Sequence, residues 1–464
     1  MYSAFRHYVP RSFLMLGLIE AALLFGAIYV GVWLRFGGEP GASEHIAPIF
    51  PKALFFVVVM SLTMTAMGLY QRNLRQGTGG VLMRLGLSFL LGFTIMSLVF
   101  YAVPSLFIGR GAFGLGFIVA LFLVLGMRGT FYRMVDEDTL KRRVMVLGAG
   151  KRALPITQLK RKNDLHGIII LGYVHISGEH DVVGDDKVLH PDTSLVEFAR
   201  ANQVDEIVVA VEDRRKNFPV HELLDCKMSG IEVFDVLSFF ERQLGKLQLD
   251  LLHPSWLIFS SGFRAGPVRA YLKRSFDVVV SLVMLAVTWP LMALVALAIL
   301  IEGGGKGPVL YRQVRVGQNW QLFQVLKFRS MHVGAEKDGV PQWAQSKDGR
   351  ITRVGGFIRK TRMDELPQLI NVLRGDMSFV GPRPERPMFV ENLSEQIPYY
   401  SERHRVKPGI TGWAQISYPY GASEKDALEK LQYDLYYVKN YSLFLDMEIL
   451  FQTAEVILWG KGAR

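Results

Sequence analysis

Residues 362–385 read RMDELPQLINVLRGDMSFVGPRPE, and this stretch decides how the C-terminal half of the chain is interpreted. Its apolar residues follow the i, i+3, i+4, i+7 spacing of an amphipathic helix. They are Leu366, Leu369, Ile370 and Leu373. Gly375 is suited to end that helix, and Pro367 is tolerated in its first turn, where backbone amides have no partner inside the helix. The pattern therefore predicts a short helix that begins near Asp364 and Glu365.

Asp364 and Glu365 are adjacent carboxylates at the N-terminal end of this predicted helix. The unpaired amides and the positive end of the helix dipole favour an ionised carboxylate there, and they also attract phosphate. The alternative is structural, because an N-cap aspartate beside a dipole-compensating glutamate is the more common reason for a lone Asp-Glu pair. The arginine and the prolines that follow in the same stretch favour a reactive site over capping.

Three cations are candidates to hold a phosphate beside this pair. Residues 322–331 read as a strand in which period-2 alternation places Lys327 and Arg329 on one face. Arg383 stands between two prolines, so its side chain projects from a stiff backbone, as a bidentate phosphate contact requires. The alternatives are binding of anionic lipid by the two strand cations and a structural ion pair of Arg383.

The N-terminal third is dominated by apolar runs. The chain has 464 residues, enough for two or three domains, and 50% of them are hydrophobic. The mean hydropathy of +0.22 is high for a soluble protein. Four runs approach the length that spans a bilayer, at residues 13–34, 53–70, 85–103 and 113–127. We expect a transmembrane four-helix bundle within residues 1–135, with the first run retained as an anchor because no signal-peptide cleavage site follows it.

The distribution of Lys and Arg predicts the orientation of this bundle. Positive residues gather before the first run, between the second and third, and after the fourth. They are Arg6, Arg11, Arg72, Arg75, Arg84, Arg128, Arg133, Lys141, Arg142 and Arg143. Both ends of the bundle should therefore face the cytoplasm. Membrane flanks and phosphate contacts then explain the net charge of +11, and the sequence has no nucleic-acid-binding motif.

Cysteine and histidine usage limits other functions. Cys226 is the only cysteine, which excludes an intrachain disulfide and a zinc site built from a cysteine cluster. None of the ten histidines belongs to an HExxH pattern, so a histidine-based metal site is not expected. The single cysteine fits a reducing, cytosolic setting for the parts outside the membrane.

Residues 141–243 have the alternation of a Rossmann-like α/β domain. An apolar strand from Val144 leads into a GxGxxA motif formed by Gly148, Gly150 and Ala153, which suits a weak nucleotide-type site. A lone glycine motif is a weak signal, and the second predicted strand, 168–174, is not followed by the acidic residue that binds the ribose of NAD. Catalytic use of NAD is therefore disfavoured. A regulatory nucleotide site and a purely structural domain both stay open.

A further apolar segment covers residues 278–301 and is long enough to cross a membrane. Its flanks are basic on both sides, with Arg264, Arg269, Lys273 and Arg274 before it and Lys306, Arg312 and Arg315 after it. Crossing would carry one basic flank and the rest of the chain to the outer side. Pro290 falls near the middle, where it removes a helix hydrogen bond and forces a kink. We therefore predict a re-entrant helical hairpin at about 275–301, after a linker at 244–270 and within a catalytic domain at 271–464.

These motifs together resemble the bacterial polyprenyl-phosphate hexose-1-phosphate transferases, the monotopic phosphoglycosyl transferases. The resemblance covers the chain from about residue 270 to its end. It rests on the basic-led apolar helix with its central proline and on several linked blocks. These are residues 307–313, 327–331, 364–384, 407–415 and 433–440. The membrane bundle and Rossmann-like domain before them resemble the large members of this family, which initiate exopolysaccharide, capsule or O-antigen assembly.

The resemblance implies a reaction and a set of site residues. A sugar 1-phosphate would pass from a UDP-sugar, of the glucose or galactose type, to undecaprenyl phosphate, with release of UMP at the cytoplasmic face of the bacterial inner membrane. Asp364 would be the nucleophile that forms a covalent phosphosugar intermediate. Asp364 and Glu365 would bind Mg²⁺, and Asp434 would be a further acidic member of the site. Lys327, Arg329 and Arg383 would bind the transferring phosphate.

The last apolar segment, about 444–459, reads either as an interfacial helix or as core packing. Two other functions stay open. One is a membrane-anchored nucleotide-sugar epimerase or dehydratase, which the missing ribose acid and the lack of a Tyr-x-x-x-Lys pair in the middle domain disfavour. The other is a non-catalytic scaffold for polysaccharide assembly. The sequence does not fix the sugar, the polysaccharide pathway, the ligand of the middle domain or the oligomeric state, for which a homodimer is one possibility.

Overall fold

The structure is a computed structural model that describes most of the chain. It covers residues 11–37, 48–70, 78–134, 141–159, 165, 167–213, 215, 218–260, 262–263, 266–335, 349–418 and 423–459. Several cations used above for membrane orientation lie outside these residues. They are Arg6, Arg72, Arg75 and Arg264. The chain divides into two compact units, Met1–Phe239 and Phe240–Arg464.

The first unit begins with the apolar helices α1 (Arg11–Phe36), α2 (Ile49–Ala66), α3 (Thr78–Ala102) and α4 (Arg110–Met134), with a short turn η2 (Pro104–Leu106) between the last two. In the described part of the chain, α1, α3 and α4 contain segments long and apolar enough to cross a membrane, and α2 is shorter. The prediction of apolar helices at these runs is confirmed. Their assembly as a transmembrane bundle stays a prediction.

Buried polar contacts join these helices. The Arg128 guanidinium on α4 lies 2.7 Å from the Glu20 carboxylate on α1, and both side chains are buried. The Tyr70 hydroxyl donates to the same carboxylate at 2.6 Å. Arg84 on α3 donates to the Met67 carbonyl just after α2. Arg84 and Arg128 were predicted to be membrane-flanking charges, but the structure buries both, because Arg128 pairs with Glu20 and Arg84 donates to the Met67 carbonyl inside the helical assembly.

The middle part of the first unit is a parallel sheet with helices, as the sequence predicted. Its five strands lie in the order β3-β2-β1-β4-β5. The strands are β1 (Arg142–Leu147), β2 (Ile168–Val174), β3 (Val188–Leu189), β4 (Glu206–Val209) and β5 (Glu232–Asp235). The connecting helices are α5 (Leu154–Thr157), α6 (Leu195–Ala201) and α7 (Val220–Met228), with a turn η3 (Asp185–Lys187), and α8 (Val236–Leu244) follows β5. The core is built from alternating strand residues and the buried Cys226.

The second unit is assembled around one long helix and two small sheets. Its first elements are η4 (Leu249–Leu251), α9 (Pro254–Phe259), α10 (Pro267–Glu302), β6 (Leu310–Val316), η5 (Gln318–Trp320), β7 (Leu322–Phe328), α11 (Arg353–Lys360), η6 (Met363–Glu365) and α12 (Gln368–Arg374). Its later elements are β8 (Ser378–Val380), α13 (Pro387–Gln396), η7 (Tyr400–Arg405), β9 (Gly409–Thr411), α14 (Trp413–Ser417), α15 (Glu424–Asn440) and α16 (Leu443–Trp459). β6 and β7 form an antiparallel hairpin, and β8 pairs with β9 in parallel.

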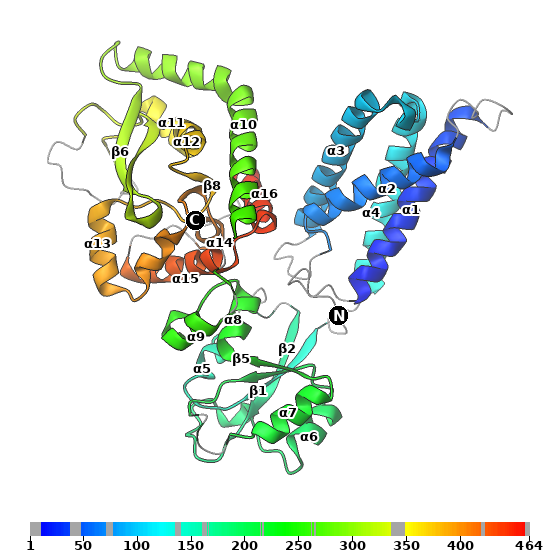
Figure 1. The fold of residues 1–464 in the computed structure, drawn as a ribbon, viewed down its shortest axis with the longest axis vertical. Helices are drawn as coiled ribbons and strands as arrows, with labels where there is room; N and C mark the ends of the chain where they lie inside the picture. The colour runs from blue at the N-terminus through cyan, green and yellow to red at the C-terminus, as the bar shows by residue number, and fades with distance from the viewer. Residues whose placement is uncertain are drawn as a thin grey trace. The chain divides into compact units, whose positions relative to one another are not determined.

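α10 is a single helix of 36 residues with Pro290 inside it. Figure 1 shows that it bends sharply along its length. A proline removes one helix hydrogen bond and crowds the preceding turn, which explains the bend. The predicted hairpin is thus replaced by one bent helix, because the break changes the direction of the helix without reversing it. Many apolar side chains on α10 are exposed, such as Val287 and Leu294. A re-entrant path through a membrane stays a prediction.

The N-terminal half of α10 is tied to the elements beside it. The Arg274 guanidinium donates to the carbonyls of Val372 and Leu373, at 2.6 and 2.7 Å, in the last turn of α12. The buried Asp277 carboxylate accepts from the Ser378 hydroxyl at 3.1 Å. Lys273 pairs with Asp446 of α16 at 2.6 Å. Lys273 and Arg274, which the sequence suggested as a membrane flank, therefore connect α10 to the core of the unit.

The described side chains of α16 distinguish between an interfacial helix and core packing. Leu445, Asp446 and Ile449 are buried, and Leu445 and Ile449 pack in one cluster with Trp413 and Tyr437. The first half of α16 is therefore core. Lys461 and Arg464, which follow the helix, lie outside the described residues.

Candidate active site

The Asp-Glu pair lies in a tight turn before α12. Arg362 has a left-handed backbone (φ 60°), and the 3-10 turn η6, Met363–Glu365, follows it. Pro367 precedes the first residue of α12, and Gly375 ends that helix with φ 94°. The helix and its end at Gly375 are as predicted. The acids, however, do not lie in its first turn, because the left-handed Arg362 starts a separate turn that carries them. Nearby side chains, rather than the end of a seven-residue helix, therefore set their charge.

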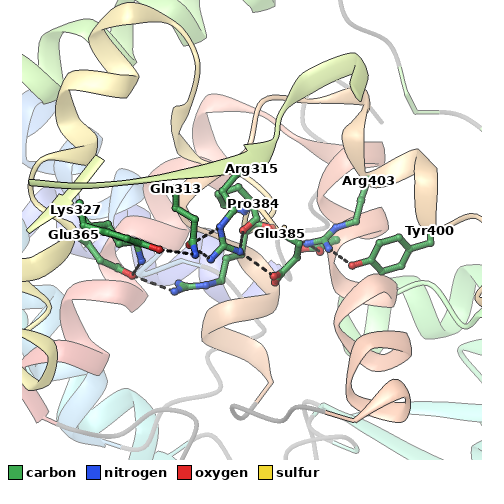
Figure 2. A network of polar contacts seen from close by, with 11 residues as sticks. Gln313, Arg315, Lys327, Glu365, Pro384, Glu385, Tyr400 and Arg403 are labelled. Atoms are coloured by element: carbon green, nitrogen blue, oxygen red, sulfur yellow. Dashed lines mark hydrogen bonds and ion pairs between the residues drawn. The ribbon is translucent and has the colours of Figure 1, made fainter. Parts of the chain in front are cut away.

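Three cations surround the Glu365 carboxylate. Figure 2 shows one of them, Lys327, beside Glu365. Its Oε1 atom lies 3.1 Å from Nη2 of Arg383, 3.3 Å from Nζ of Lys327 and 3.8 Å from Nη1 of Arg362. The side chain is only 12% exposed. Burial alone would raise the pKa of Glu365, but Arg383, Lys327 and Arg362 outweigh it and hold the pKa at about 2. Glu365 is therefore ionised at any physiological pH.

The Asp364 carboxylate has different surroundings. Burial and the charge of Glu365 raise the pKa of Asp364, and Lys327, Arg359 and Arg362 act in the opposite direction. Among the described residues, the Asp364 carboxylate forms no hydrogen bond or ion pair. Two adjacent carboxylates thus have pKa values shifted in opposite directions, which is typical of groups with different roles in one site. Glu365 is held by cations, and Asp364 has no such partner among the described residues.

Lys327 and Arg329 are close in sequence but reach different places. Lys327, near the end of β7, points to Glu365, and burial, together with Arg383, lowers its pKa. β7 ends at Phe328, so Arg329 lies outside the strand and the alternation of side chains between its two faces does not apply to it. Its guanidinium donates to the carbonyls of Lys306 (3.1 Å) and Ile299 (3.5 Å) at the C-terminal end of α10. Of the two strand cations, the structure brings only Lys327 to Glu365. A phosphate-binding role of Arg329 stays a prediction.

Arg383 extends from a backbone held by two buried prolines, Pro382 and Pro384. Its side chain is 36% exposed, so one side can still meet a ligand while Nη2 contacts Glu365. The alternative of a structural ion pair is therefore partly correct, since the pair with Glu365 exists. A half-exposed guanidinium that contacts the Asp-Glu turn at Glu365 can also accept a phosphate, because Arg binds phosphate through two parallel N–H groups.

A second layer of polar residues lies behind Arg383, and the sequence did not indicate most of it. Arg315 on β6 donates to Gln313 at 2.7 Å, to the Pro384 carbonyl at 3.1 Å and to the Glu385 carboxylate at 3.3 Å (Figure 2). Arg403 in η7 donates to the Tyr400 hydroxyl at 2.6 Å. Glu385 ends the stretch quoted first, but its partner could not be read from it. Arg403 stands in a basic run, 403–407, that reads as a solvated surface.

Asp434 belongs to this second layer. On α15 it is 2% exposed, and its Oδ2 atom lies 2.7 Å from Nη2 of Arg403. Burial raises the pKa of Asp434 to about 6, with Glu385 acting in the same direction and Arg403 against it. Its partner in the structure is thus Arg403, and a role in the reacting site itself stays a prediction.

The implied Mg²⁺ can be tested against the donors present. Among the described residues there is no group of three or more His, Cys, Asp or Glu side chains that could hold a metal ion. Mg²⁺ usually binds one or two carboxylates and completes its shell with water and substrate phosphate. Asp364 and Glu365 can provide those two carboxylates, so the donor set fits a Mg²⁺ that arrives with a phosphate substrate.

The glycine motif of the middle domain has acidic neighbours. Gly148 has φ 105°, and Gly150 and Ala153 continue the loop that follows β1. The Lys151 amide of this loop donates to the Glu212 carboxylate at 2.8 Å. The Glu212 amide in turn donates to Glu179 at 2.6 Å. Carboxylates thus stand where a pyrophosphate would contact the loop. A nucleotide site there stays a prediction, which this charge disfavours.

Comparison with known families gives a match over the second unit. The family model described as "Bacterial sugar transferase" matches residues 268–460. That range contains α10, the Asp-Glu turn, Arg383 and Asp434.

Three relatives extend the comparison. The chain is 43% identical, over 52% of its length, to a UDP-N-acetylgalactosamine-undecaprenyl-phosphate N-acetylgalactosaminephosphotransferase of Aeromonas hydrophila, and spans 56%, about half, of that protein. It is 35% identical to a UDP-glucose:undecaprenyl-phosphate glucose-1-phosphate transferase of Klebsiella pneumoniae, over 73% of this chain and 72% of that one. A protein of Xanthomonas campestris pv. campestris with the same description is 29% identical over 100% of this chain and 96% of its own.

Proposed function

The chain belongs to the bacterial sugar transferase family, as the resemblance of its motifs indicated, and we propose that it transfers a sugar 1-phosphate from a UDP-sugar to undecaprenyl phosphate. The observation that carries this proposal is the arrangement of the Asp-Glu turn. Within the part of the chain that the structure describes, the Asp364 carboxylate has no partner, and it lies beside a Glu365 that three cations surround. The three cations and two carboxylates leave a net charge of +1, so the turn attracts a phosphate.

The first step uses Asp364 as the nucleophile. One of its carboxylate oxygens attacks the phosphorus that is bonded to the sugar of the UDP-sugar. A bond forms between Asp364 and this phosphorus, and the bond from the phosphorus to the bridging oxygen of the diphosphate breaks. That oxygen leaves with the electron pair as part of UMP. The product on the protein is a phosphosugar joined to Asp364 as an acyl phosphate, which divides the transfer into two easier steps.

In the second step, a phosphate oxygen of undecaprenyl phosphate attacks the same phosphorus. The bond to Asp364 breaks, its carboxylate is restored, and the lipid leaves as undecaprenyl diphosphate-sugar. Lys327 and Arg383 are placed to bind the negative charge on the transferring phosphate in both steps, because a phosphate oxygen can replace Glu365 at their N–H groups.

A Mg²⁺ held by Asp364 and Glu365 together with substrate phosphates would help neutralise the charge on departing UMP. Before substrate arrives, the cations keep Glu365 ionised and oriented, so the turn is ready to accept a metal bound to a diphosphate.

The exposed apolar surface of α10 supports the proposal of a lipid substrate. Large side chains such as Val287, Trp289 and Leu294 are more than 60% exposed, and this surface fits the apolar part of a membrane leaflet. We place the second unit at the cytoplasmic face of the inner membrane, with α10 entering the leaflet and returning. There the turn would meet a soluble UDP-sugar and a lipid head group, and the reaction would start exopolysaccharide or O-antigen assembly.

The donor sugar is proposed to be of the glucose or galactose type. The relatives above act, by their descriptions, on glucose and on N-acetylgalactosamine. The decisive experiment therefore incubates membranes that contain the full chain with undecaprenyl phosphate, Mg²⁺ and UDP-glucose, UDP-galactose or UDP-N-acetylgalactosamine, and records UMP. We expect release with one or more of these donors.

Two variants test in this assay whether Asp364 is the nucleophile. Asp364→Asn should reduce UMP release by at least about a thousandfold, since an amide cannot form the acyl phosphate. Asp250→Asn, at an exposed position of the same unit, should leave it unchanged. Absence of UMP with all three donors, or full activity of Asp364→Asn, would contradict the proposed function.

A further inference from the structure

The segment that carries Arg383 has its backbone carbonyls bound one after another. Five carbonyls between residues 380 and 385 accept hydrogen bonds from elsewhere in the second unit. The pairs are Val380 with Lys273 and Tyr437 (3.1 and 3.0 Å), Pro382 with the Gly409 amide (2.9 Å), Arg383 with Arg403 (3.0 Å), Pro384 with Arg315 (3.1 Å) and Glu385 with the Val316 amide (3.0 Å). Because prolines also restrict the backbone on both sides of Arg383, the path of this segment is fixed.

Arg403 makes the one contact in this set that reaches the backbone of Arg383 itself. Its guanidinium is held on two other sides, by the Tyr400 hydroxyl at 2.6 Å and by the Asp434 carboxylate at 2.7 Å. The side chains of Arg403 and Asp434 are 7% and 3% exposed. A planar guanidinium with a fixed fork of N–H groups, anchored by two partners, has little freedom in where its remaining N–H points.

Burying an arginine destabilises the folded state unless a carboxylate pairs with it. Asp434 provides that charge, and its own burial is tolerated for the same reason. Neither side chain is exposed enough to reach a substrate. Together, Arg403 and Asp434 therefore direct a single hydrogen bond, from Nη2 of Arg403 to the Arg383 carbonyl.

The backbone and side chain of Arg383 move together. The guanidinium that extends from this backbone lies 3.1 Å from Glu365 and faces the turn of Asp364. A displacement of about 1 Å in a substrate-binding group can reduce a rate by about a hundredfold. A donor that fixes the Arg383 carbonyl thus controls whether the guanidinium meets the phosphate in the productive geometry.

We propose that Arg403 is a positioning residue for Arg383, and that Asp434 acts by holding Arg403 rather than as a member of the reacting site. The proposal rests on the proposed function, since it assigns Arg383 to the transferring phosphate. It predicts that loss of the Arg403 fork reduces turnover only through Arg383.

The test is a double-mutant cycle in the full chain, assayed in membranes for UMP release. Arg403→Lys keeps a positive charge for Asp434 but loses the planar fork. We expect kcat to fall about 10- to 100-fold, with KM for the UDP-sugar changed by less than about threefold, because the misplaced group acts in the transition state. In an Arg383→Ala background, Arg403→Lys should cause no further loss, since the residue it positions is gone. Arg405→Lys, a change at an exposed neighbour paired with Glu402, is the matched control and should stay within twofold of the unmodified chain.

A second measurement does not depend on activity. The melting temperatures of Arg383→Ala, Glu365→Gln and the double variant give the coupling between these two residues. We expect this coupling to fall when Arg403→Lys is added. Equal losses of kcat in both backgrounds, or an unchanged coupling, would overturn the positioning role. Absence of UMP release by the unmodified chain would instead contradict the proposed function, and the coupling measurement would still decide the role of Arg403.

Discussion

Two regions of this chain place a backbone turn where a phosphate could bind, and their surroundings have opposite charge. At the Asp-Glu turn of the second unit, the carboxylate of Glu365 is surrounded by Arg383, Lys327 and Arg362. At the glycine loop after β1, the Lys151 amide is met by the carboxylate of Glu212. The glycine loop has the better-known sequence motif. The Asp-Glu turn has the positive charge that a phosphate needs.

The comparison shows that a motif for backbone geometry does not determine a ligand. Gly148 supplies a left-handed turn that brings the loop amides close to whatever lies opposite them. In this chain that partner is a carboxylate of the same domain, so we predict that the loop binds a pyrophosphate poorly. The chemistry proposed for the second unit depends instead on side chains brought together from β7, η6 and the segment after β8.

Among the charged groups that surround the two turns, the largest effect is expected from removing Arg383. Arg383→Ala should reduce kcat for UMP release by about a hundredfold, as expected for the loss of one donor that stabilises charge in a transition state. The measurement is steady-state UMP release with undecaprenyl phosphate present. Arg312→Ala, an exposed arginine on β6, is the control. Equal activity of the two variants would remove the distinction between this turn and an ordinary basic surface.

A smaller effect is expected on the pH dependence of stability, through the buried Asp434 that pairs with Arg403. The pKa of Asp434 is raised from 3.8 to about 6, so the folded state binds this proton more tightly than the unfolded state does. The stabilisation is fully present below pH 3.8 and is lost as pH rises through about 6. Between these values, the free energy of unfolding should fall as pH rises.

Asp434→Asn should lack this part of the pH dependence, which unfolding of the full chain at several pH values would measure. Asp250→Asn should retain it, because that residue is exposed. The same slope in Asp434→Asn and in the unmodified chain would show that Asp434 does not carry a raised pKa.

The smallest effect is expected at the glycine loop. Replacing Glu179 and Glu212 by glutamine should lower the melting temperature of the chain by only about 2 °C, since these hydrogen bonds lie near the surface. Millimolar NAD should not raise the melting temperature of the unmodified chain. A clear stabilisation by NAD would show that a dinucleotide displaces the carboxylates from the loop. The two regions would then not differ in their ability to bind a phosphate.

The sequence predicted the elements of the second unit better than their contacts. Apolar spacing located α12, Gly375 marked its end, and the parallel α/β pattern of the middle domain was correct. Pro290 indicated a kink in α10, and the helix is bent. A proline does not determine the direction in which the chain continues, so a hairpin was predicted where one bent helix is found.

The site was predicted in part for similar reasons. Lys327 and Arg383 both contact Glu365, and their binding of one phosphate stays a prediction. Alternation along a strand placed Arg329 with Lys327, but alternation does not show where the strand ends, and β7 ends one residue too early. Arg315 and Arg403 were missed because their importance comes from burial and from partners distant in sequence, which local pattern does not record.

The central claim is that Asp364 receives the phosphosugar before the lipid does. The most direct measurement incubates the full chain with a UDP-sugar labelled at the phosphate attached to the sugar, without undecaprenyl phosphate. The account predicts release of about one UMP per chain and label bound to the protein, with neither seen in Asp364→Asn. Unlabelled protein, with UMP released only after undecaprenyl phosphate is added, would contradict it.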